Sequence, residues 1–328
     1  MMQQYAQIKE KYSDCIIFFR LGDFYEMFLE DAKIGAEILD ITLTSRDRGK
    51  DGRIPMAGIP YHAVDSYLPR LVKAGHKVAI CEQVSSPDAG GLMKREIVRV
   101  VTSGTLMTEG TLEKKKNNYI FSLVQQHVAG KISLGVGLAD LSTGDFQVQE
   151  FTLEGKEHLR AVLQETVYRY NPVECVLTLE LYNDSEVLAF LRDNQDFSIN
   201  FFDQAEFYIQ NASHFLEEHF RVDHLGGFGI QEKEVAQMAG SFLLGYLIST
   251  QKSSLEHMTS IGLIHNQDYV GLDQSTIHNL ELFSTLKTGS KKGSLVNYLD
   301  KTRTSMGGRM LRAWIRNPLR DAVEIASR

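Results

Sequence analysis

The sequence predicts a multidomain α/β protein, and three observations support that prediction. The chain has 328 residues, which is enough for two or three domains. Apolar runs typical of buried strands alternate with helical patterns in residues 1–110 and again in 111–253, whereas 254–328 shows mainly helical spacing. We therefore expect a mixed-sheet α/β domain in 1–110, a second α/β domain in 111–253 and the start of an all-α domain in 254–328.

The first domain begins with a short amphipathic helix at 5–12 and a continuous apolar strand at 15–21. Residues 23–40 follow with helical spacing, because Phe24, Phe28 and Ala32 recur on one helical face and Asp23 can cap the helix. The remaining predicted elements are a strand at 41–45, a loop rich in Arg, Lys, Gly and Pro at 46–62, a helix at 63–75, and strands at 76–84 and 95–105.

A charged connector at 113–119 marks the predicted domain boundary. The segment 131–151 then indicates a β-hairpin with "STGD" as its turn, and 157–170 and 234–250 indicate helices. Further strands are predicted at 119–126 and 174–179, and helices at 274–287, 294–302 and 305–316. Because the last residues read as a continuing helix, we expect the chain to be a fragment of a longer protein.

Composition narrows the class of protein. No apolar run approaches the roughly 18 residues of a membrane span, which predicts a cytoplasmic protein. The three cysteines are scattered, which is typical of reduced structural thiols. The net charge of −7 is uneven: it is −1 in 1–110, −9 in 111–253 and +3 in 254–328, so DNA binding is disfavoured only for the middle segment.

Other familiar sites are not indicated by the sequence. The ten His residues show no close metal-ligand spacing, so no zinc site is predicted. The stretch "TGSKKGS" at 288–294 fails the G-x-x-x-x-G-K-[ST] spacing of a phosphate loop and is typical of a flexible basic loop. We expect no cofactor to bind this chain.

The stretch "RLGDFYEMF" at 20–28 leaves two interpretations open. The shared helical face favours Phe24 as a core aromatic and Glu26 as a solvated helix residue. Against this, Phe24 follows a strand directly and so lies at the edge of the sheet. The loop that follows also carries the cations Arg46, Arg48, Lys50 and Arg53.

Longer motifs give a resemblance that decides between these interpretations. "GDFYEMF", "IPMAGIPYHAVDSYL" and "VAICEQV" resemble the mismatch-recognition domain of the MutS family of DNA mismatch repair proteins. "LDQSTIHNLELF" and "TSMGGRMLRAWIRNPL" resemble the helical core and lever domain of the same family. For the residues between these motifs, 111–253, the resemblance implies a ribonuclease H-like connector domain. The resemblance to the family thus runs in order across nearly the whole chain.

The resemblance implies that Phe24 and Glu26 read mispaired or looped bases in duplex DNA. A Phe wedge discriminates because a mispaired step is cheaper to unstack and kink than a matched one. A raised Glu26 pKa would let its carboxyl donate a proton to the displaced base. The candidate phosphate contacts are Arg46, Arg48, Lys50 and Arg53, with Met56 as a further contact near the kink.

The resemblance also implies partners and cofactors of the longer family members. These are a MutL-type repair protein, a homodimer, and ATP with Mg²⁺ in an ATPase domain beyond this chain; alone, the chain is expected to be a monomer or a weak dimer. Two alternatives stay open: a metal-dependent, structure-specific nuclease that uses Asp140 and its neighbour Asp145, and an interaction scaffold whose Phe24 is buried.

Overall fold

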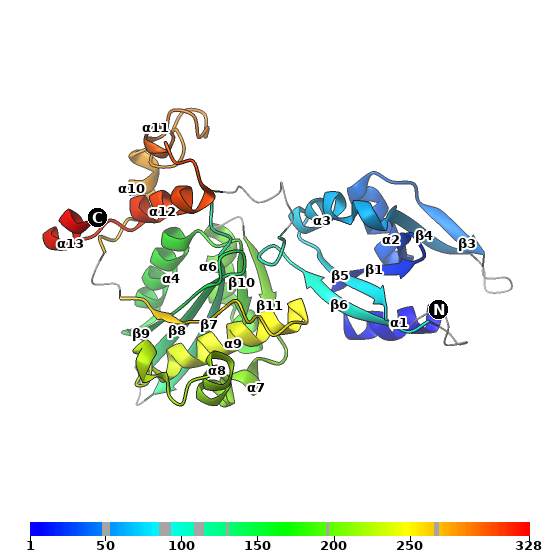
Figure 1. Cartoon of the computed structure of the whole chain (residues 1–328), viewed down its shortest axis with the longest axis horizontal. Helices are drawn as coiled ribbons and strands as arrows, with labels where there is room; N and C mark the ends of the chain where they lie inside the picture. The colour runs from blue at the N-terminus through cyan, green and yellow to red at the C-terminus, as the bar shows by residue number, and fades with distance from the viewer. Residues whose placement is uncertain (48–52, 85–92, 108–114, 129–130, 195–196, 266–268) are drawn as a thin grey trace. The chain divides into compact units, whose positions relative to one another are not determined.

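The computed structural model describes residues 1–47, 53–84, 93–107, 115–128, 131–194, 197–265 and 269–328 (Figure 1). The chain divides into two compact units. The first is Met1–Thr111 with Leu247–Leu255, and the second is Leu112–Tyr246 with Glu256–Arg328. Among the described residues, no helix has both the length and the apolar character needed to cross a membrane.

A six-stranded mixed sheet forms the centre of the first unit, in the order β3-β4-β2-β1-β5-β6. β1 and β5 pair in parallel, and the other neighbours pair antiparallel. The strands are β1 (Cys15–Leu21), β2 (Phe24–Phe28), β3 (Thr44–Asp47), β4 (Arg53–Pro60), β5 (Lys77–Gln83) and β6 (Arg95–Val101).

Helices cover both faces of this sheet and bury its alternating apolar side chains. On one face, α1 (Met2–Lys11) packs through Tyr5 against a cluster that includes Phe19 and Phe28. On the other, α2 (Leu29–Leu39) and α3 (Val64–Lys73) cover a second cluster. Because strand side chains alternate, each strand residue belongs to one of these two faces.

The second unit contains another six-stranded mixed sheet, in the order β11-β10-β7-β8-β9-β12. α4 (Lys156–Tyr170), α5 (Leu179–Asn183) and α6 (Ser185–Asn194) contribute apolar side chains to the cluster on one face. The strands are β7 (Ile120–Val128), β8 (Lys131–Asp140), β9 (Asp145–Leu153), β10 (Glu174–Leu177), β11 (Ser198–Phe201) and β12 (Gly262–Leu263).

α9 (Glu234–Gln251) approaches this sheet unusually closely at β8. A Cβ atom at Gly135 would lie 2.1 Å from the Val235 carbonyl oxygen, and one at Gly137 would lie 2.8 Å from that of Ala239. The Ser122 hydroxyl donates to the Ala239 carbonyl at 2.8 Å. The sheet therefore needs glycine at these two positions to accept the helix.

Short helices account for the rest of the second unit. In chain order they are α7 (Ala205–Gln210), α8 (Ala212–Phe220), η4 (Leu225–Phe228), α10 (Gln274–Asn279), α11 (Leu295–Leu299), α12 (Ser305–Arg316) and α13 (Ala322–Ser327). The mixed α/β class predicted from the sequence is confirmed, as are the strand at 15–21 and the hairpin around "STGD".

The predicted helix at 23–40 is wrong over its first third. Residues Phe24–Phe28 form a strand between β1 and β4, and the helix begins at Leu29. The N-cap is Phe28, so Asp23 does not cap the helix as predicted. The error has a simple origin: residues four apart share a face in a strand as well as in a helix, so the spacing of Phe24 and Phe28 fits both structures.

The predicted loop at 46–62 is also wrong over most of its described part, because it contains β4. β4 pairs with β2 on one side and β3 on the other, although Pro55, Gly58 and Pro60 disfavour a strand locally. The strand preceding it starts at Thr44 rather than Ile41. Pairing on both sides outweighs the weak local propensity of β4.

Candidate nucleic-acid interface

Phe24 lies at the exposed end of a tight hairpin. Leu21 pairs with Phe24, so Gly22 and Asp23 alone form the turn between β1 and β2. Gly22 has a φ of 57°, a conformation that favours glycine. This explains why the motif "GDFYEMF" begins with glycine. The Phe24 side chain is 47% exposed, so the interpretation of Phe24 as a core aromatic is wrong.

A polar cluster lies behind this hairpin. The Arg20 guanidinium stacks 3.6 Å from the centre of the Tyr61 ring, and the Tyr61 backbone N–H donates to the Asp23 carbonyl at 2.9 Å. Tyr25 is buried and donates its hydroxyl to Glu82. Burial raises the pKa of Tyr25, and the contact with Glu82 raises it further. No local pattern in the sequence points to Arg20, Tyr61 or Glu82, because only strand pairing brings these residues together from distant parts of the chain.

Glu26 is half-buried two residues beyond Phe24, on the same face of the strand. Its Oε2 atom is buried and has no hydrogen-bond partner among the described residues. Burial raises the pKa of this carboxyl, and the nearby Arg46 partly lowers it. The interpretation of Glu26 as a solvated helix residue is therefore wrong, and its carboxyl can bind an incoming polar group.

The strand register brings four of the predicted site residues onto one face of the sheet. Glu26 pairs with Gly58 and Phe28 with Met56, so Met56 lies on the face of Phe24 and Glu26. Arg46 pairs with Ile54, and Ile54 belongs to the same α1-side cluster as Phe28. Arg46 therefore also lies on the face of Phe24 and Glu26. We call Phe24, Glu26, Arg46 and Met56 the wedge face.

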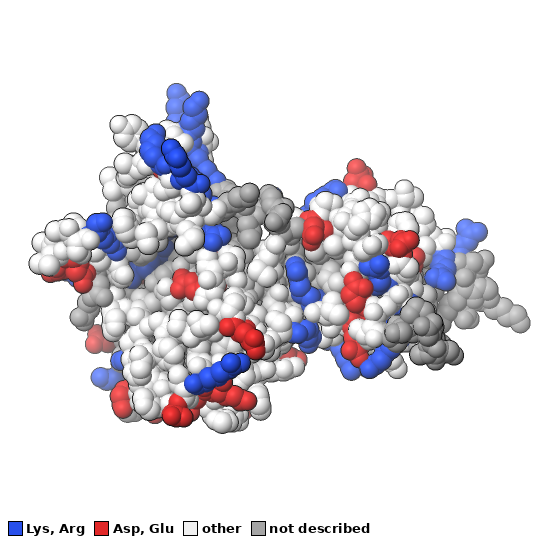
Figure 2. Space-filling view, in the orientation of Figure 1, with Lys and Arg blue, Asp and Glu red and all other residues white. Residues whose placement is uncertain are grey.

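The other loop cations are not on the wedge face. Arg53 is exposed and alternates with Ile54, which puts it on the opposite face of β4. Arg48 and Lys50 lie outside the described residues. Figure 2 shows Lys and Arg side chains at the end of the first unit where β3 and β4 project, beside the residues drawn in grey.

The acids proposed for a nuclease have structural roles instead. Asp140 is fully buried and accepts hydrogen bonds from the backbone N–H groups of Asn118 (3.0 Å) and Ser142 (2.9 Å) and from the Ser142 hydroxyl (2.7 Å). Asp145 accepts from the Tyr119 hydroxyl at 2.8 Å and from the Gln147 amide at 2.9 Å. These contacts close the β8–β9 turn and explain both acids without a metal.

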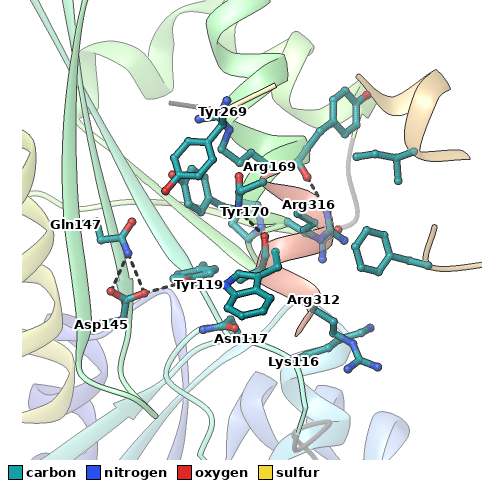
Figure 3. A pocket seen from close by; sticks show the side chains of 18 of the residues that line it. Lys116, Asn117, Tyr119, Asp145, Gln147, Arg169, Tyr170, Tyr269, Arg312 and Arg316 are labelled. Atoms are coloured by element: carbon teal, nitrogen blue, oxygen red, sulfur yellow. Dashed lines mark hydrogen bonds between the residues drawn. The ribbon is translucent and has the colours of Figure 1, made fainter. Parts of the chain in front are cut away.

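A cavity of about 1240 Å³ opens beside Asp145 in the second unit (Figure 3). Arg316 donates to the Tyr168 carbonyl at 2.6 Å and lies 4.2 Å from the centre of the Phe283 ring, and burial lowers its pKa to about 10. Arg312 pairs with Asp300 at 3.2 Å. Arg316 thus joins α12 to α4, and Arg312 joins α12 to the end of α11, so these two arginines are engaged by groups of the chain itself.

Metal-ligating side chains do not converge in the part of the chain that the structure describes, where no group of three or more His, Cys, Asp or Glu residues could hold an ion. The cysteines Cys15, Cys81 and Cys175 are buried and unpaired with one another, and burial raises the pKa of Cys15 and of Cys81 to about 12. Such thiols are poor nucleophiles at neutral pH.

Comparison with known proteins identifies the family. Three family models match in order: MutS domain I over residues 1–110, MutS domain II over 118–259 and MutS domain III over 275–328. The DNA mismatch repair protein MutS of Halothermothrix orenii is 43% identical over 329 residues, which cover 100% of this chain and 36% of that protein. The corresponding protein of Ruminiclostridium cellulolyticum is 44% identical, again over 100% of this chain and 36% of its own length. The chain spans about a third of the length of these relatives. It belongs to the MutS family, and its three matches are to the models of domains I, II and III.

Proposed function

We propose that this chain recognises mispaired or looped bases in duplex DNA and that this binding initiates mismatch repair. The observation that carries the proposal is the wedge face, where Phe24, an aromatic residue that is 47% exposed, stands beside a carboxyl oxygen with no partner among the described residues. The relatives are named as DNA mismatch repair proteins, which agrees with this function.

Phe24 acts as the wedge in this proposal. Its position beside a two-residue turn lets the ring project from the sheet without unfolding its own strand. Insertion into the minor groove unstacks one base step and kinks the duplex, at a cost of a few kcal/mol per step. A mispaired step is already weakly stacked and costs less, so deformability alone separates mispaired from matched DNA.

Glu26 contacts the displaced base and also opposes binding to matched DNA. A carboxyl whose pKa is raised by burial can donate a hydrogen bond to a base acceptor when it is protonated. When it is ionised and no base reaches it, it repels the phosphates of the duplex. Arg46 supplies a phosphate contact on the same face, and Met56 adds apolar contact near the kink.

The remaining assignments follow from the family and are part of the same proposal. The chain performs no catalysis itself and holds no cofactor, while ATP and Mg²⁺ act in an ATPase domain of the longer family members. A MutL-type repair protein docks on domain II, whose exposed acidic side chains suit protein contact (Figure 2). The longer proteins act as homodimers in the bacterial cytoplasm, near the nucleoid.

Binding to oligonucleotide duplexes tests the proposed function directly. We expect the chain to bind a G·T duplex more tightly than the otherwise identical G·C duplex, and to lose affinity for both as salt rises. Fluorescence anisotropy at two salt concentrations measures both effects. Equal affinity for the two duplexes at low salt would contradict the proposal.

Glu26→Gln is expected to raise affinity for matched DNA and thereby reduce discrimination. The substitution removes the charge that opposes insertion while it keeps the size of the side chain. It should also raise the unfolding temperature at neutral pH. Burial raises the pKa of Glu26 above its ordinary value of 4.5, so folding disfavours the ionised carboxylate. The stability that the protonated Glu26 contributes is therefore lost as the pH rises through this raised pKa.

The same two measurements with Glu30→Gln provide the control, because Glu30 is an exposed acid outside the wedge face. An unchanged affinity of Glu26→Gln for the G·C duplex would refute the role of the charge.

A further inference from the structure

Gly58 lies at the centre of the wedge face, and no side chain fills its position. It pairs directly with Glu26 across β2 and β4, and it is exposed. A Cβ atom built at Gly58 would lie 3.6 Å from Cγ of Glu26 and 3.8 Å from Cδ1 of Phe24. The absence of a side chain therefore leaves open the space between the wedge ring and the carboxyl.

The fold itself does not require glycine here. The β2–β4 pairing runs in unbroken register through Gly58, so no bulge is present. Its φ lies outside the left-handed region, unlike that of Gly22. The nearest backbone atom to the added Cβ, the Tyr25 carbonyl oxygen, is 3.5 Å away, an ordinary van der Waals contact.

Gly35 of the same unit shows the contrasting case. A Cβ atom there would lie 2.3 Å from Sδ of Met27, so packing accounts for that glycine. At Gly58 there is no bulge, no positive φ and no close packing that would explain a glycine. Glycine inside a strand weakens the strand, and the remaining common reason for it is the close approach of a ligand.

We propose that Gly58 determines specificity, because its missing side chain lets the edge of the displaced base and its sugar reach Glu26 beside the Phe24 ring. The inference rests on the proposed function, and it adds a steric requirement on the facing strand. A side chain at position 58 would occupy the gap between ring and carboxyl and would hold the nucleotide away from both. The ligand in question is a nucleotide within duplex DNA.

The test compares Gly58→Ala and Gly58→Val with the unaltered chain for binding to G·T and G·C duplexes. We expect Gly58→Ala to lower the ratio of the two affinities by about fivefold, which corresponds to about 1 kcal/mol, and Gly58→Val to lower it further. Both variants should fold, and Gly58→Ala should unfold at the same or a higher temperature, since alanine restricts the unfolded chain more than glycine does.

Two controls separate the possible outcomes. Gly227→Ala adds a methyl group where no atom lies within 4 Å, and it should leave both affinities unchanged. If the unaltered chain does not prefer the G·T duplex, the proposed function fails. The inference about Gly58 fails alone under a different set of results. In that case the unaltered chain prefers the G·T duplex, Phe24→Ala loses this preference, and both Gly58→Ala and Gly58→Val keep it in full. A fall in the unfolding temperature of Gly58→Ala together with an unchanged affinity ratio would assign Gly58 to the fold and likewise overturn the inference.

Discussion

Phe24→Ala is expected to abolish the preference for a G·T duplex over a G·C duplex while the chain stays folded. Phe24 is 47% exposed, so removal of its ring leaves no large cavity, and we expect the free energy of unfolding to change by about 0.5 kcal/mol or less. The binding effect should be much larger, about 2 kcal/mol or more, as is common for aromatic side chains at the centre of an interface. Fluorescence anisotropy and thermal unfolding measure the two effects on the same samples.

Phe28→Ala is the matched control for this substitution. Phe28 lies on the same strand but is fully buried against Tyr5 and Phe19, so its truncation should cost about 3–5 kcal/mol of stability. The two phenylalanines should thus separate binding from folding. If Phe24→Ala instead lowered the unfolding temperature by several degrees and kept the preference for the G·T duplex, the wedge role would be lost.

Asp31→Ala is expected to destabilise the first unit by about 3–5 kcal/mol, because it breaks a buried charged network. The Asp31 carboxylate is 3% exposed and accepts from the Tyr5 hydroxyl at 2.8 Å, from Lys9 Nζ at 2.8 Å and from the Ile17 backbone N–H at 3.0 Å. These contacts join α1, α2 and β1. Their loss leaves the buried Ile17 N–H without an acceptor. The Tyr5 hydroxyl and Lys9 Nζ lose a charged acceptor and keep only the carbonyls of Phe28 and Cys15.

Hydrogen exchange read by mass spectrometry locates this effect. Peptides from β1 and β2 should lose protection in Asp31→Ala, and peptides from β7 and β8 of the second unit should not. Glu30→Ala is the control, because Glu30 is an exposed neighbour whose pair with Lys33 contributes little. Unchanged protection of β1 in Asp31→Ala would show that the network does not hold the first unit together.

The sequence predicted the elements whose local signals agree with one another. The run of apolar residues at 15–21 gave a strand with the correct bounds, and the hairpin of β8 and β9 followed from alternating residues around a turn. The motifs in residues 22–84 and 272–319 also predicted the family correctly. In each case neighbouring residues carried the whole signal.

The sequence did not predict the secondary structure around the site itself. Phe24 and Phe28 fit either a helix or a strand by their spacing, and only the pairing of β2 with β1 and β4 decides for the strand. Likewise Pro55, Gly58 and Pro60 indicated a loop, whereas β4 is held on both sides by partners from other parts of the chain. Local propensity is weak compared with such pairing.

By itself the sequence determined the class of fold, the family and the two residues proposed to read the base, since these depend on residue identity and short-range order. Only the tertiary structure decided that the Phe24 ring is exposed, that Arg46 and Met56 share its face while Arg53 does not, and that Gly58 lies between the ring and Glu26. The physical reason is strand register. A shift of one residue turns every side chain to the opposite face, and that register is set by partners far away in the chain.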